Sequence, residues 1–179
     1  MSRKKVLVLG GNFGGLTAAL AVSHELHGDV DIRVISASDR FVFNPSLIWL
    51  PFGKRRPADI TFPLATTFED HGIEFVHAEA TWIDLASQKV TAASGAYDYD
   101  YLIIATGYRN NFGAVPGLGP GGNAYTITTL EDAIRAGKGG GGSSTVRETS
   151  SWARARERGA SEPPTSTCST CPTGCARRA

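Results

Sequence analysis

The feature that most constrains the fold of this chain is a glycine-rich turn, GGNFGG at residues 10–15, placed between two apolar runs. Lys5 to Leu9 is short and β-branched, which predicts a buried strand. Leu16 to Leu26 is rich in Ala and Leu at helical spacing, and Gly28 follows it, which predicts a helix and its end. A glycine turn between a strand and a helix is the context in which a GxGxxG-like loop binds a dinucleotide.

The chemistry of such a loop belongs to its backbone. Gly10 permits the tight turn, Gly15 lets the helix approach the strand, and the N–H groups at the helix start face a pyrophosphate. Asn12 stands where the pattern has its middle glycine, and it adds bulk there. The alternative interpretation is a tight turn that binds no ligand.

A second strand, Asp31 to Ile35, is followed by Ser36, where a dinucleotide-binding fingerprint usually has an acidic residue. A hydroxyl can hydrogen-bond a ribose, but without the strength that a carboxylate's charge adds. This departure argues against a plain NAD-binding domain.

The remaining pattern predicts an α/β fold, a partial Rossmann-like nucleotide-binding domain with a small antiparallel β-meander. A capping-box spacing places Thr129 as an N-cap with Asp132 three positions on. The other expected elements are a loop with a short helix over 40–57, a helix over 63–71, strands over 73–77, 80–85, 89–92, 97–101 and 101–105, and a helix over 129–136.

The composition changes abruptly after Lys138. Residues 139–179 contain no Leu, Ile, Phe, Tyr or Met, and they carry all three cysteines, six Arg and three Glu. A segment so poor in large apolar side chains cannot offset its ordering entropy by burial. We therefore expect a partial nucleotide-binding domain over 1–138 and a tail over 139–179 that is disordered or out of frame.

The tail also carries Cys168, Cys171 and Cys175, three thiolates that could bind zinc. It has no His and no second CxxC pair, so we expect no metal site. We identify no catalytic residue. A net charge of +1 gives no argument for nucleic acid, and no apolar run reaches the roughly 18 residues of a membrane span. The N-terminus lacks signal-peptide features, so we expect a cytoplasmic protein.

Four motifs in order, KVLVLGGNFGGLTAAL, VISASDRFVFNPSLIWLPFGKR, YDYLIIATG and VPGLGP, resemble the FAD-binding half of the pyridine nucleotide-disulfide oxidoreductase superfamily. The chain looks most like sulfide:quinone oxidoreductases, with type II NADH dehydrogenases as near neighbours. The resemblance implies that FAD binds non-covalently. The residues implied for the pyrophosphate loop are Gly10, Gly11, Asn12, Phe13 and Gly14. Those implied for the other parts of the cofactor are Ser36 and Ala37 at the ribose, Pro45 at the flavin ring, Ala80 at the adenine, and Thr106 and Gly107 in the closing ATG motif.

By the same resemblance, the complete enzyme would pass electrons from a small-molecule donor through FAD to a quinone-like acceptor, with peripheral membrane association. Sulfide chemistry implies a redox cysteine where this chain has Thr128, and a hydroxyl cannot form disulfide intermediates. Two further alternatives remain: a free-standing NAD(P)-binding enzyme, and a non-enzymatic regulator with a metal-binding tail.

A shifted reading frame accounts for the tail. Read from the third base of each codon, residues 149–153 become compatible with DVVVG, and 160–175 with CFGAAYEYLFNVSYRL. These strings resemble the continuation of the same family. We therefore expect a frameshift near codon 138 and no activity from the chain as written.

Overall fold

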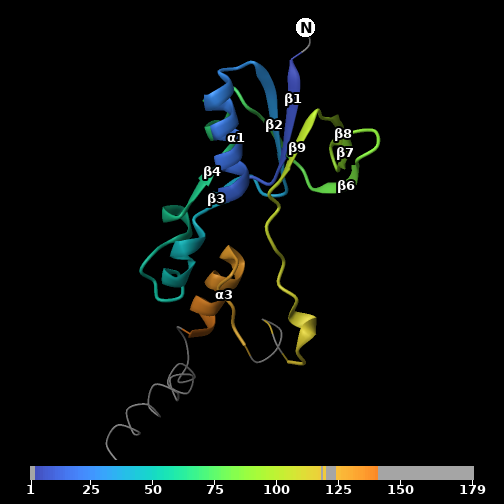
Figure 1. Ribbon diagram of the computed structural model, residues 1–179. Coiled ribbons are helices and arrows are strands. Elements are labelled where there is room, and N and C mark those ends of the chain that lie inside the picture. Colours follow the sequence, from blue (N-terminus) through green and yellow to red (C-terminus); the bar gives the residue numbers. More distant parts are fainter. Residues whose placement is uncertain (1–2, 118, 120–123, 141–179) are drawn as a thin grey trace, which may run out of the picture. The chain divides into compact units, whose positions relative to one another are not determined.

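The computed structural model describes residues 3–117, 119 and 124–140 (Figure 1). The chain divides into two units, Met1–Lys138 and Gly139–Ala179. The account below concerns the first unit. The expectations about the tail, including Cys168, Cys171 and Cys175, fall on residues 141–179 and so lie outside the described residues.

A four-stranded parallel sheet forms the centre of this unit, in the order β5-β2-β1-β9. The strands are β5 (Glu74–His77), β2 (Val30–Ser36), β1 (Lys4–Leu9) and β9 (Tyr101–Ile104). Val8 pairs with Val34 on one side and with Ile103 on the other, so β1 is internal. Runs of Val, Ile and Leu suit a parallel sheet that is covered on both faces. This sheet confirms the predicted α/β, Rossmann-like fold.

Each face of the sheet buries alternate side chains of its strands. The α1 (Phe13–Leu26) and α2 (Leu64–Glu69) helices cover one face, with a core of Val6, Val8, Ile32, Val34, Ala19, Leu64 and Phe68. The other face packs Leu7, Leu9 and Ile35 against Val90, Ala92 and Tyr99. The period of two along each strand therefore divides the core into two layers.

An antiparallel sheet of β6 (Ala80–Asp84), β7 (Lys89–Ala92) and β8 (Gly95–Asp98) supplies the second layer, and Figure 1 shows it on the side of β1 away from α1. The predicted meander is confirmed, but the bounds of its third strand, 97–101, were wrong. Ala92 pairs with Gly95 across a tight turn, while Tyr101 pairs with Val6 in the parallel sheet.

A short hairpin that the sequence did not predict follows β2. Strand β3 (Arg40–Val42) pairs with β4 (Thr61–Pro63), and between them lie the 3-10 helices η1 (Asn44–Trp49) and η2 (Pro57–Asp59). Leu47 and Leu50 pack there against Ile60 and Ala133. A third, smaller core thus joins this segment to helix α3 (Leu130–Gly140). A further 3-10 helix, η3 (Phe112–Ala114), follows β9.

Two helix ends differ from the expected bounds. Helix α1 begins at Phe13 rather than Leu16, because the N–H of Leu16 donates to the carbonyl of Asn12 despite the low helix propensity of the glycines between them. Helix α3 extends to Gly140 rather than Ala136. Its predicted N-cap is confirmed, since Thr129 Oγ1 accepts the N–H of Asp132 at 3.1 Å. In the described part of the chain, no helix has the length and apolar character needed to cross a membrane.

Candidate nucleotide-binding site

The glycine turn lies at the carboxyl end of β1 and leads into α1. Gly10 has a positive φ of 102°, and its N–H donates to the carbonyl of Ile35 at 2.8 Å. A Cβ on Gly10 would overlap the carbonyl oxygen of Ala105, and a Cβ on Gly15 would overlap that of Gly10. The backbone therefore excludes a side chain at both positions, which is the geometry that a dinucleotide loop requires.

The two remaining glycines of the turn differ from each other. A Cβ on Gly11 would lie 2.5 Å from Leu64 Cδ1 and 3.1 Å from Ser36 Oγ. A Cβ on Gly14 would meet Ala105 Cβ alone, at 3.4 Å, which is ordinary contact. Packing thus explains Gly11, whereas the protein leaves room for a small side chain at Gly14.

Asn12 is the N-cap residue of α1, yet its side chain makes no capping hydrogen bond. Its Oδ1 is buried and has no partner among the described residues. Buried polar atoms are normally hydrogen-bonded, so an unpaired amide beside the glycine turn fits a ligand that supplies the missing bond. The amide can present its oxygen or, after a flip, its NH2 group.

Ser36 ends β2 next to the glycine turn and is buried. Its Oγ accepts the N–H of Ser38 at 3.2 Å, which leaves the hydroxyl proton available for donation. The carbonyl of the next residue, Ala37, lies 3.1 Å from His77 Nε2 on the neighbouring strand β5. Both residues therefore occupy fixed positions at the carboxyl edge of the sheet, where open α/β sheets bind ligands.

A cavity of about 490 Å³ brings most of the predicted site residues together at this edge. Those that line it are Gly10, Gly11, Asn12, Ser36, Ala37, Ala80 and Thr106. A groove of about 890 Å³ shares Asn12 and Thr106 with the cavity and continues past Gly107. Residues from β1, β2, the start of β6 and the end of β9 thus meet around one continuous space.

Three predicted residues do not line this space. Phe13 packs its ring against Phe41 and Phe43, with centroids 4.8 and 5.7 Å apart. Pro45 is exposed in η1, and its neighbour Asn44 lines the groove instead. Gly14 lies in the first turn of α1, outside the lining of both spaces.

Two arginines line both the cavity and the groove, and the sequence analysis missed them. Arg40 donates from Nε and a terminal nitrogen to Thr61 Oγ1, at 3.3 and 3.1 Å. Arg109 has no hydrogen-bond or ion-pair partner among the described residues. Among the described residues that line the cavity, Glu79 is the single carboxylate, so positive charge prevails there. A basic residue two positions after the ATG glycine was the signal that could have revealed Arg109.

The groove also contains Thr128, the residue at the position where the family resemblance implies a cysteine. Its hydroxyl lies 3.0 Å from Thr126 Oγ1 and accepts a hydrogen bond from Asn110 Nδ2. Thr128 therefore belongs to a hydroxyl–amide network on the groove wall and supplies no thiol chemistry.

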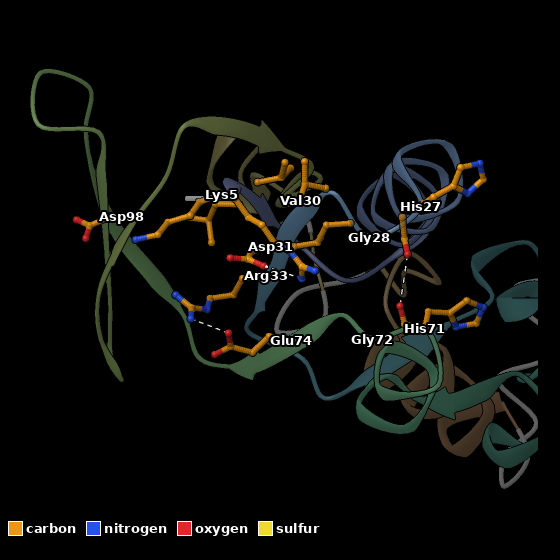
Figure 2. A pocket seen from close by; sticks show the side chains of 15 residues that line it. Lys5, His27, Gly28, Val30, Asp31, Arg33, His71, Gly72, Glu74 and Asp98 are labelled. Carbon is orange, nitrogen blue, oxygen red and sulfur yellow. Dashed lines mark hydrogen bonds and ion pairs between the residues drawn. The ribbon is translucent and has the colours of Figure 1, made fainter. Parts of the chain in front are cut away.

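A further cavity, of about 550 Å³, lies at the opposite, amino-terminal edge of the sheet (Figure 2). Arg33 points toward Glu74 and pairs with it at 2.6 Å, and Arg3 pairs with Asp31 at 3.7 Å. These pairs compensate the charges of Arg3 and Arg33, although Arg33 Nε is buried without a hydrogen-bond partner among the described residues. In residues 3–117, 119 and 124–140, no cluster of three or more His, Cys, Asp or Glu is placed to hold a metal ion.

Comparison with known proteins shows which family this chain is similar to. The sequence pattern of the pyridine nucleotide-disulphide oxidoreductase family matches residues 4–156. The sulfide-quinone reductase of Aquifex aeolicus is 38% identical over 136 residues, which cover 75% of this chain and 31% of the relative. A type II NADH:quinone oxidoreductase of Staphylococcus haemolyticus is 31% identical over 135 residues, covering 73% of this chain and 32% of the relative.

The crystal structure of the Aquifex aeolicus sulfide:quinone oxidoreductase is also similar. It superposes with a TM-score of 0.69 and 35% sequence identity, over 83% of this chain and 32% of that one. The chain thus spans about a third of the length of the curated relatives that it matches.

Proposed function

Because this chain belongs to the pyridine nucleotide-disulphide oxidoreductase family, we propose that residues 4–138 form the N-terminal, FAD-binding portion of a flavin-dependent quinone reductase. The observation that carries the proposal is the convergence of the glycine turn, Ser36 and Thr106 on one cavity at the carboxyl edge of the sheet. The sites for the electron donor and the electron acceptor of such an enzyme would come from the regions of the relatives that this chain does not match.

The residues that line the cavity fit a dinucleotide. The N–H groups at the start of α1 would donate to its pyrophosphate, and Arg40 and Arg109 would supply positive charge. The Ser36 hydroxyl would donate to the ribose, and the amide of Asn12 would gain the partner that it lacks. FAD, when bound, supplies the electron-transfer chemistry, and the role of this portion is to bind and orient it.

The donor of the complete enzyme is a narrower question within the same proposal. Ser36, in place of an acidic residue, favours a sulfide:quinone reductase-like enzyme over a type II NADH dehydrogenase-like one. Thr128 argues against sulfide as the electron donor, because sulfide oxidation needs a thiolate and residues 1–138 contain no cysteine. Quinone is the acceptor named for both classes of relative, so it is the part of the proposal that both support. We expect a cytoplasmic location.

The proposal is tested by titrating the full chain with FAD while following flavin fluorescence and visible absorbance. We expect saturable FAD binding that NAD and NADP do not displace. Arg109→Gln, in the cavity, should weaken FAD binding. The matched control is Arg135→Gln, on α3, which should leave FAD binding unchanged. Binding of NAD or NADP without flavin would identify a Rossmann enzyme of the other class, and no nucleotide binding would identify the turn as purely structural.

The origin of residues 139–179 is a separate proposal. The change in composition carries it, because residues 139–179 contain no Leu, Ile, Phe, Tyr or Met. We attribute the composition beyond Lys138 to a shifted reading frame. Sequencing the source DNA across codons 130–180 tests this directly, since a DNA sequence that keeps the written frame without an inserted or lost base would overturn it.

A further inference from the structure

The strands β2 and β5 stay paired up to the predicted ribose position, where Ser36 and His77 are their last partners. Just beyond this pair, the N–H of Ala78 donates to the carbonyl of Ser36 at 2.9 Å. The carbonyl of Ala37, one residue further, lies 3.1 Å from Nε2 of the His77 ring. A carbonyl oxygen only accepts, so Nε2 is assigned the ring proton and donates it. The side chain of His77 therefore extends the bonding between the two strands by one residue.

The peptide between Ala37 and Ser38 carries this contact toward the cavity. The C=O and N–H of a trans peptide point in opposite directions, and the described backbone contains no cis peptide. A bond that holds the Ala37 carbonyl toward β5 therefore also sets the direction of the Ser38 N–H. That N–H donates to Ser36 Oγ at 3.2 Å, which closes a turn on the serine hydroxyl.

The Ser36 hydroxyl is the last group in this series. Ser36 is buried and lines the cavity, whereas His77 is exposed and lies outside the lining. Because Ser36 Oγ accepts the Ser38 N–H, its own proton can be donated in a different direction. The His77 ring is thus linked to the cavity through the turn, without touching the space that a ligand would fill.

We propose that His77 is a positioning residue for the adenosine half of FAD. Through the Ala37 carbonyl and the Ser38 N–H, its ring orients the Ser36 hydroxyl to donate to a ribose hydroxyl. This role for His77 rests on the proposed FAD site and names the part of the nucleotide that the β5 end of the cavity recognises. The ring acts only as a hydrogen-bond donor, and its effect is confined to the ribose hydroxyls.

The alternative role for His77 is to stabilise the end of β5 and nothing more. A loosened strand end would weaken the binding of every nucleotide in the cavity by a similar factor. A contact that acts through Ser36 weakens only those ligands that have a ribose hydroxyl to accept its proton. ADP and 2′,3′-dideoxy-ADP differ in these hydroxyls alone, so the two ligands distinguish the two roles.

Isothermal titration of the full chain with FAD, ADP and 2′,3′-dideoxy-ADP provides the test. We expect His77→Phe to weaken FAD and ADP binding about threefold to tenfold, the effect of one hydrogen bond, and to leave dideoxy-ADP binding unchanged. The matched control is His71→Phe, because His71 is also exposed and its ring also bonds one carbonyl, that of Thr67 at 2.8 Å, away from the cavity. It should change none of the three affinities. Equal losses for ADP and dideoxy-ADP in His77→Phe would overturn the proposal in favour of the purely structural role.

Further variants test the order of the contacts. Ser36→Ala removes the last group, so adding His77→Phe to it should cause no further loss of ADP affinity, whereas independent contributions would add. His77→Gln can place an amide N–H near the position of Nε2 and should keep the affinity of the unsubstituted chain. His77→Asn is shorter by one carbon and should behave like His77→Phe. Additive losses, or a His77→Gln variant as weak as His77→Phe, would contradict the proposal.

Amide hydrogen exchange of the unliganded chain, followed by NMR, tests the turn itself. In His77→Phe the Ser38 amide should exchange about threefold faster or more, while Ala78, which bonds the Ser36 carbonyl through its backbone, should keep its rate. An unchanged Ser38 rate would refute the link between the ring and the turn. An unsubstituted chain that binds neither FAD nor ADP would overturn the proposed FAD site together with the role of His77. Normal FAD binding that His77→Phe leaves unaltered would overturn the role of His77 alone.

Discussion

Gly15 in the first turn of α1 lies so close to the carbonyl oxygen of Gly10 that any Cβ on Gly15 would overlap it. The contact sets the approach of the helix to β1 and so shapes the pyrophosphate loop. We expect Gly15→Ala to lower the free energy of unfolding by about 1–3 kcal/mol through overpacking. Urea denaturation followed by circular dichroism measures this. Gly14→Ala is the control, because its Cβ has room and alanine favours a helix by up to about 1 kcal/mol.

A substitution at Gly14 should affect FAD binding without affecting the stability of the fold. Gly14→Val should keep the urea midpoint close to that of the unsubstituted chain, since a Cβ at this position meets only Ala105 Cβ on the protein side. The branched side chain at the start of α1 should nevertheless crowd the approach of a pyrophosphate and weaken FAD binding by about tenfold or more. Fluorescence titration gives the affinity. An unchanged affinity would show that the turn serves the fold alone.

Asn12 should respond to substitution according to charge. Asn12→Gly gives up the hydrogen bond expected from the amide to FAD, but it also removes side-chain bulk from the approach to the pyrophosphate, so the two effects should offset each other and FAD affinity should hold. Asn12→Asp places a carboxylate beside the expected pyrophosphate and should weaken FAD binding by about tenfold or more. Isothermal titration of both variants gives the comparison. Weaker binding in Asn12→Gly together with normal binding in Asn12→Asp would contradict this placement of the phosphates.

Arg109 should contribute to FAD binding through the phosphates. Arg109→Gln removes a guanidinium that has no partner among the described residues, and we expect about a tenfold loss in FAD affinity at low salt. The loss should shrink as salt rises. Riboflavin, which has no phosphate, is the matched ligand and should bind both proteins equally. An equal loss for riboflavin would place Arg109 against the ring instead.

The strand–turn–helix core was predictable because its signals are local. The apolar run before Gly10 and the residues of the GGNFGG turn each depend on neighbours in sequence. The β3–β4 hairpin was not predictable, because each strand has three residues and Phe41 meets Phe62 only through a separation of about twenty positions. Arg40 and Arg109 reach one cavity for the same reason: the fold, rather than spacing, brings them together.

Asp100 joins the start of β9 to β1 and should make stability depend on pH. Its Oδ2 accepts the N–H of Lys5 at 2.8 Å, and its Oδ1 pairs with Lys4 Nζ at 2.9 Å. These bonds, the one from the Lys5 backbone first, lower the pKa of the Asp100 carboxyl below its ordinary 3.8. A carboxyl with a lower pKa in the folded state stabilises the fold above the pKa of the unfolded state, and it loses that effect as pH falls through the pKa of the folded state.

We therefore expect Asp100→Asn to lower the urea midpoint at neutral pH, and the difference from the unsubstituted chain to close below about pH 3.8. Asp70→Asn, at the exposed end of α2, is the control and should change the midpoint less. A difference that stays constant down to about pH 3 would mean that the shape of the carboxyl, and not its charge, holds the two strands together.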